Sequence, residues 1–123
     1  MPADMNVLLV DDEAELVSTL AERLTLRGIN ASWVTSGEEA LRRLETTAFD
    51  IAVLDVKMPK VDGLELKKRL QERCPAMKFI FVTGHGSTRD FETGASAVGK
   101  EYYLVKPLNI ETLIAKLKEA LQR

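Results

Sequence analysis

The chain has 123 residues and a hydrophobic fraction of 46%, which suffices for one domain with its own core and leaves no room for a second. Its net charge is −2 with acids and bases interspersed, so no basic surface for nucleic acid is expected. No stretch has the pattern of a membrane span or a signal peptide. We therefore expect a single soluble, cytoplasmic domain over residues 1–123 that contacts neither nucleic acid nor membrane.

An apolar run of strand length at residues 6–10 ends in three adjacent acids, Asp11, Asp12 and Glu13. Acids suit the first turn of a helix, and leucines at positions 16, 20 and 24 predict that a helix follows, with its stop at Gly28. That interpretation explains one acid well and three poorly. Carboxylates clustered at the end of an interior parallel strand repel one another unless a cation is present. The pattern favours a divalent metal ion.

A second strand is expected at residues 29–34, and its lower apolar content suits the edge of a sheet. Ser36 and Glu39 then have the spacing of a capping box, which predicts the start of a helix. Residues 51–55 are aliphatic up to a terminal carboxylate, Asp55. This composition is typical of a strand buried on both faces.

After Asp55, the segment Lys57-Met58-Pro59 is expected to interrupt regular structure. A helix with Leu66 and Leu70 facing inward follows. A buried strand at residues 78–82 then leads to Thr83. A weaker helix is expected next, because Gly94 falls in its middle and costs about 1 kcal/mol relative to alanine.

The last strand is expected at residues 102–105, directly before Lys106. Asn109 can cap a final helix that carries a regular apolar stripe. Five strands alternating with five helices predict an α/β fold, a three-layer sandwich with right-handed crossovers. The doubly wound flavodoxin-like order, 2-1-3-4-5, is the economical arrangement. It brings the ends of the first, third, fourth and fifth strands to one edge.

A carboxylate at that edge can attack phosphorus if the charge of the phosphoryl group is screened. Mg²⁺ suits this role, because it takes about six oxygen ligands and usually retains water. We expect Asp12 and Asp55 to bind it directly, Asp11 to hold the metal or its water, and the backbone carbonyl of Lys57 to be a neutral ligand. Lys106 can neutralise a phosphoryl oxygen, and the Thr83 hydroxyl can donate a hydrogen bond to another.

The sequence resembles the receiver domain of bacterial two-component response regulators. The resemblance covers nearly the whole chain, and its motifs are weak singly but highly specific together. They are Val10-Asp11-Asp12-Glu13, Leu54-Asp55-Val56-Lys57-Met58-Pro59, Asp62-Gly63, Val82-Thr83-Gly84-His85 and Tyr103-Leu104-Val105-Lys106-Pro107.

This resemblance implies that Asp55 accepts a phosphoryl group from a histidine kinase or phosphotransfer protein, with Mg²⁺ beside it. It further implies that Thr83 and Tyr103 form a switch pair and that a cis peptide bond precedes Pro107. Phosphorylation would then change the surface of the fourth helix, fifth strand and fifth helix, and so control an output domain, a downstream protein or a homodimer.

Each of these residues, taken singly, also has an ordinary structural explanation. Lys106 is also explained as a surface lysine, Thr83 as a strand-end hydroxyl and Tyr103 as core, although jointly these explanations fit poorly. Cys74 is expected to be a packed thiol. His85 is expected to lie outside the chemistry, because in this family the phosphohistidine belongs to the kinase.

The expected function is a switch module and not an enzyme with its own substrate. One alternative is a phosphohydrolase that passes through an aspartyl phosphate. Such an enzyme would need a second acid two residues after the nucleophile, where this chain has Lys57. Another is a pseudo-receiver scaffold, and a third is a flavodoxin-like cofactor binder, which lacks its phosphate loop here. Gly94, Gly99 and Lys100 depart from the family's usual pattern. The chain ends one helix after the fifth strand, as a stand-alone receiver or as part of a longer regulator.

Overall fold

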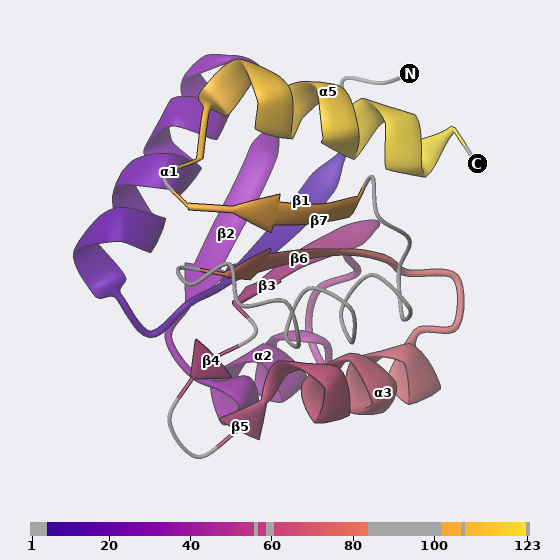
Figure 1. Ribbon diagram of the computed structural model, residues 1–123. Coiled ribbons are helices and arrows are strands. Elements are labelled where there is room, and N and C mark those ends of the chain that lie inside the picture. Colours follow the sequence, from indigo (N-terminus) through magenta and orange to yellow (C-terminus); the bar gives the residue numbers. More distant parts are fainter. Residues whose placement is uncertain (1–4, 56, 59–60, 84–101, 107, 123) are drawn as a thin grey trace.

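The computed structural model describes residues 5–55, 57–58, 61–83, 102–106 and 108–122, with the backbone alone at 57, 58 and 61–64. Its centre is a five-stranded parallel sheet in the order β2-β1-β3-β6-β7 (Figure 1). These strands are β1 (Asn6–Val10), β2 (Asn30–Val34), β3 (Ile51–Asp55), β6 (Lys78–Thr83) and β7 (Tyr103–Val105). Counted along the chain, the order is 2-1-3-4-5, so the doubly wound flavodoxin-like fold is confirmed.

Helices cover both faces of this sheet (Figure 1). Helices α1 (Ala14–Leu26) and α5 (Ile110–Leu121) lie on one face, and α2 (Gly37–Arg43) and α3 (Gly63–Arg73) lie on the other. The helix expected around Gly94 falls within residues 84–101, outside the described residues. Within the described part of the chain, no helix has both the length and the apolar character needed to cross a bilayer.

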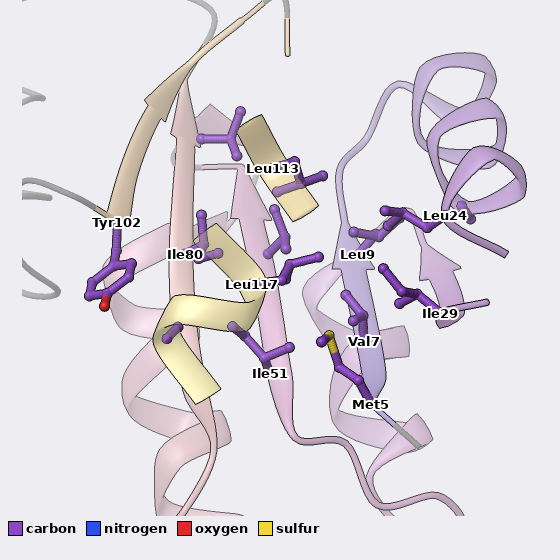
Figure 2. Packing of buried hydrophobic residues seen from close by; sticks show 14 of the residues in the cluster. Met5, Val7, Leu9, Leu24, Ile29, Ile51, Ile80, Tyr102, Leu113 and Leu117 are labelled. Atoms are coloured by element: carbon purple, nitrogen blue, oxygen red, sulfur yellow. The ribbon is translucent and has the colours of Figure 1, made fainter. Parts of the chain in front are cut away.

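Alternating side chains of the strands build two cores, one on each face of the sheet. Figure 2 shows the first, in which Leu9, Ile51 and Ile80 pack with Leu24 of α1 and Leu117 of α5. The second core joins the opposite faces of the same strands to α2 and α3. All five residues of β3 are buried, as expected for a central strand covered on both sides.

The buried face of α1 matches the expected one in part. The expected stripe is Leu16, Leu20 and Leu24. The structure buries Leu24 and packs the partly buried Leu20 against the core, and it buries Val17 and Ala21 while Leu16 leaves the core face. Leu16 is 43% exposed. An α-helix has 3.6 residues per turn, so a four-residue repeat rotates by about 40° at each step and leaves the core face.

The segment after Asp55 also differs from the expected interruption. Strands β4 (Lys57–Met58) and β5 (Val61–Asp62) form a short antiparallel pair, and α3 begins directly after it. A two-residue strand is too short to show the alternation by which strands are recognised in a sequence.

The start of α2 confirms the predicted cap. The Ser36 hydroxyl accepts a hydrogen bond from the Glu39 amide at 3.2 Å. The Glu39 carboxylate accepts from the amide and the hydroxyl of Thr35, at 3.1 and 3.0 Å. The pKa of Glu39 is therefore lowered, first by the Thr35 amide and then by the Thr35 hydroxyl. The Glu39 carboxylate thus takes its backbone hydrogen bond from the residue before the cap, and the Ser36 hydroxyl donates a longer one to it at 3.4 Å.

Asn109 caps α5, as expected, because its side-chain oxygen accepts from the amides of Glu111 and Thr112 at 2.9 and 3.1 Å. We predict that Asn109→Ala lowers the free energy of unfolding by about 1 kcal/mol. Asn109→Asp keeps the acceptor and should retain most of the stability. Urea denaturation measures both. Equal losses in the two variants would show that the side-chain acceptor is not what stabilises the helix start.

Candidate functional site

The carboxyl ends of the parallel strands bring distant residues to one edge of the sheet. Asp55 is the last residue of β3, and Thr83 is the last residue of β6. Asp11 directly follows β1, and Lys106 directly follows β7. The register pairs Val10 with Leu54, so the ends of β1 and β3 are level.

Three carboxylates gather at this edge. Asp11 and Asp55 are buried, with 8% and 6% exposure, and Asp12 is exposed. One oxygen of each lies within 4.8 Å of the others. Opposite ligands of Mg²⁺ are about 4.2 Å apart, so the cluster fits this ion if the carboxylates draw together slightly. The donor set is the one that a hard divalent cation prefers.

Lys106 supplies a positive charge to this cluster. Its ammonium lies 2.8 Å from Asp11 Oδ2, 2.9 Å from Glu13 Oε1 and 3.4 Å from Asp55 Oδ2. An ammonium has three hydrogen-bond donors, so each of the three carboxylates can accept one. The Lys106 side chain is 14% exposed, so its ion pairs with the buried Asp11 and Asp55 are only weakly screened by solvent, whereas the pair with the exposed Glu13 is screened more.

The pKa of Lys106 reflects two opposing effects. Burial alone would lower it, but hydrogen bonds to Asp11 and Glu13 and the charges of Asp11 and Asp55 outweigh burial and raise the pKa above its ordinary value. Lys106 is therefore a cation throughout the neutral range. While its carboxylate partners are ionised, the stability that its charge contributes is complete up to a pH of about 10.4, and it is lost as the pH rises through the raised folded-state pKa.

Asp11 is held by contacts on both of its oxygens. Oδ1 accepts from the Glu13 amide at 3.0 Å, while Oδ2 pairs with Lys106. The first contact joins the strand end to the start of α1. The orientation of this carboxylate is thus set by the backbone of the β1–α1 turn.

Thr83 and Tyr103 lie on adjacent strands. Thr83 is fully buried, and its carbonyl accepts from the Lys106 amide at 2.8 Å. Tyr103 is 4% exposed and meets Phe81 edge to face, with ring centroids 6.5 Å apart. The register pairs Phe81 with Tyr103, and Thr83 is two residues beyond Phe81. Thr83 and Tyr103 therefore face the same side of the sheet.

A hollow of about 720 Å³ opens beside Asp55 and Lys106. Apolar residues of α1, including Leu16 and Leu20, contribute to its wall together with Leu108. Leu16, which is exposed, therefore forms part of the wall of this hollow. Asp55 is itself one of the residues that line this hollow.

The structure brings together the predicted residues Asp11, Asp12, Asp55 and Lys106, with Thr83 at the next strand end. Lys57 lies two residues beyond Asp55, in β4, where its backbone alone is described. His85 and Pro107 fall outside the described residues, and with them the expected cis bond.

Sequence reasoning did not assign Glu13 to the site. The signal was present, because Glu13 is the third of three adjacent acids. The position of its carboxylate depends on Lys106, which lies 93 residues away.

The profile of the response regulator receiver domain family matches residues 7–118. The chain belongs to this family. The transcriptional regulatory protein TrcR of Mycobacterium tuberculosis is 34% identical to it over 97% of this chain and 46% of TrcR. The receiver domain thus spans about half the length of that relative.

Solved structures resemble it as well. A CheY-like receiver domain from Methanospirillum hungatei superposes with a TM-score of 0.85 and 29% identity, covering 97% of this chain and 94% of that one. A Burkholderia pseudomallei response regulator was solved with a phosphorylated aspartic acid, a calcium ion and citrate. It superposes with a TM-score of 0.83 and 27% identity, covering 97% of this chain and 69% of that one.

We predict that Lys106→Met lowers the free energy of unfolding of this receiver domain by about 1–3 kcal/mol at pH 7 without metal, because buried carboxylates lose their charged partner. Lys118→Met, at an exposed position of α5, should change it by no more than about 0.5 kcal/mol. Urea denaturation in EDTA compares the two. An effect of Lys106→Met no larger than that of Lys118→Met would contradict the assigned ion pairs.

Proposed function

We propose that this receiver domain is a phosphorylation-dependent signalling switch in the cytoplasm, in which Asp55 accepts a phosphoryl group from a histidine kinase or phosphotransfer protein. The observation that carries the proposal is the environment of Asp55. It is a buried carboxylate at the end of the central strand, with an ammonium at 3.4 Å and two further carboxylates in a cluster that fits a divalent cation.

The chemistry is an in-line phosphoryl transfer. A carboxylate oxygen of Asp55 forms the new P–O bond as the P–N bond of a phosphohistidine breaks, and the bonding pair leaves with the imidazole nitrogen. The ammonium of Lys106 is close enough to pair with an equatorial phosphoryl oxygen. The Thr83 hydroxyl is a candidate hydrogen-bond donor to another.

Mg²⁺ fits the donor set of Asp11, Asp12 and Asp55, which would be its carboxylate ligands. The backbone carbonyl of Lys57 is the proposed fourth ligand. When bound, Mg²⁺ would screen the charge of the phosphoryl group. The four acids of this edge, with Glu13 included, outnumber the one ammonium of Lys106. An approaching phosphoryl anion therefore needs the charge of a metal. The phosphorylated aspartic acid and calcium ion of the Burkholderia relative support the same chemistry here.

The readout would pass from Thr83 to Tyr103. Phosphorylation adds about −1.5 to −2 charge at neutral pH. Thr83 would move toward that charge, and because Thr83 and Tyr103 face the same side of the sheet, this movement would change the space open to the Tyr103 side chain. The surface of β7 and α5 would then present a new shape to an output domain, a downstream protein or a second copy. Because TrcR is a transcriptional regulatory protein, control of transcription through an attached or separate domain is the proposed output.

We predict that Asp55→Asn abolishes labelling by radioactive acetyl phosphate in the presence of Mg²⁺, because a carboxamide cannot form the acyl phosphate. Asp50→Asn is the matched control. Asp50 is an exposed acid just before the same strand, and its Oδ2 accepts from the Asn6 amide. This variant should be labelled as the wild type is. Undiminished labelling of Asp55→Asn would refute the assignment and would favour a scaffold function or another acceptor.

We also predict that Asp12→Ala weakens Mg²⁺ binding by tenfold or more. Changes outside the ligands of a metal already cost about 10–100-fold, and Asp12 is proposed to be a ligand. Isothermal titration measures the dissociation constant, with Asp50→Asn again as the control. Equal constants for Asp12→Ala and wild type would place the metal elsewhere.

A further inference from the structure

The Glu13 carboxylate has a position that helix capping does not explain. Glu13 is the N-cap of α1, yet its side chain makes no capping hydrogen bond among the described residues. Its Oε1 instead lies 2.9 Å from the ammonium of Lys106. The Glu13 side chain is 62% exposed, whereas Asp11 and Asp55 expose 11% and 7% of theirs. Glu13 thus meets the buried ammonium from the solvent side.

The three carboxylate partners of Lys106 are not equivalent. Asp11 and Asp55 belong to the cluster that fits a divalent cation, and Glu13 lies outside that cluster. A cation bound there would compete with Lys106 for Asp11 and Asp55. It would leave the ion pair with Glu13 in place. Glu13 is therefore the partner that Lys106 can keep when the metal site fills.

We propose that Glu13 is a positioning residue, which holds the ammonium of Lys106 beside Asp55 while Asp11 turns to the metal. The proposal rests on the metal site and phosphoacceptor proposed above. Without the Glu13 charge, Lys106 pairs more strongly with Asp11 and Asp55 and opposes the metal at both. Glu13 thereby favours metal binding and keeps Lys106 where a phosphoryl oxygen would arrive.

A simple loss of negative charge would also weaken cation binding, so the test needs a matched control. Glu15 is exposed, lies two residues further along the chain in the first turn of α1, and forms no ion pair with Lys106 in the described structure. Glu13→Gln and Glu15→Gln remove the same charge and keep the side-chain length. The long-range electrostatic effect of either lost charge on cation binding is screened over about 8–10 Å at physiological salt, and it should be similar for both variants.

The experiment is a titration with Mg²⁺ alone, by calorimetry, of wild type, Glu13→Gln and Glu15→Gln. We expect Glu13→Gln to raise the dissociation constant about fivefold, the order of one exposed ion pair. Glu15→Gln should raise it less than about twofold. In a Lys106→Met background, Glu13→Gln should change the constant no more than Glu15→Gln does, because the cation that Glu13 holds is gone. Lys106→Gln is a second background that serves if the methionine variant does not fold.

The possible failures are distinguishable. Equal effects of Glu13→Gln and Glu15→Gln on a wild-type protein that binds Mg²⁺ would overturn the role of Glu13 and leave the metal site standing. A fivefold effect that persists without Lys106 would also overturn it, because Glu13 would then act on the metal directly. Absence of Mg²⁺ binding by the wild type, or unchanged binding by Asp12→Ala, would overturn the proposed metal site and this inference together.

Discussion

The sharing of one ammonium among carboxylates is the interaction on which the site depends. Asp11 and Asp55 are buried within reach of each other, and their charges would raise the free energy of the folded state without a cation. Lys106 supplies that cation in the absence of metal. The same contact bears on the proposed function, because a metal ion bound by Asp11 and Asp55 would compete with Lys106 for both carboxylates.

The fold makes this arrangement possible through the parallel sheet. Strand β3 lies between β1 and β6 with helices on both faces, so Asp55 stands at the end of a strand that is buried throughout. The other site residues stand at the ends of the neighbouring strands: Asp11 directly follows β1, Thr83 is the last residue of β6, and Lys106 directly follows β7. Thr83 connects the end of β6 to the end of β7, because its backbone carbonyl accepts a hydrogen bond from the Lys106 amide.

Much of this could be predicted from the sequence because it follows from short-range patterns. The aliphatic run before Asp55 predicts a buried strand, and strand order alone then brings Asp11 and Lys106 to it. Other features depend on geometry that no local pattern records. The face of α1 follows the 3.6-residue period, so Leu24 stays in the core, whereas Leu16 borders the hollow and Val17 enters the core in its place. Glu13 reaches Lys106 through a side-chain conformation set by tertiary contact.

The central claim is that the phosphoryl group resides on Asp55, and chemical mapping of the wild-type chain tests it most directly. The protein is phosphorylated with acetyl phosphate and Mg²⁺, the acyl phosphate is reduced with borohydride, and tandem mass spectrometry of the peptides locates the reduced residue. We predict that the aspartate at position 55 is converted to homoserine. Reduction at Asp11, Asp12 or any other acid, with position 55 unchanged, would contradict it.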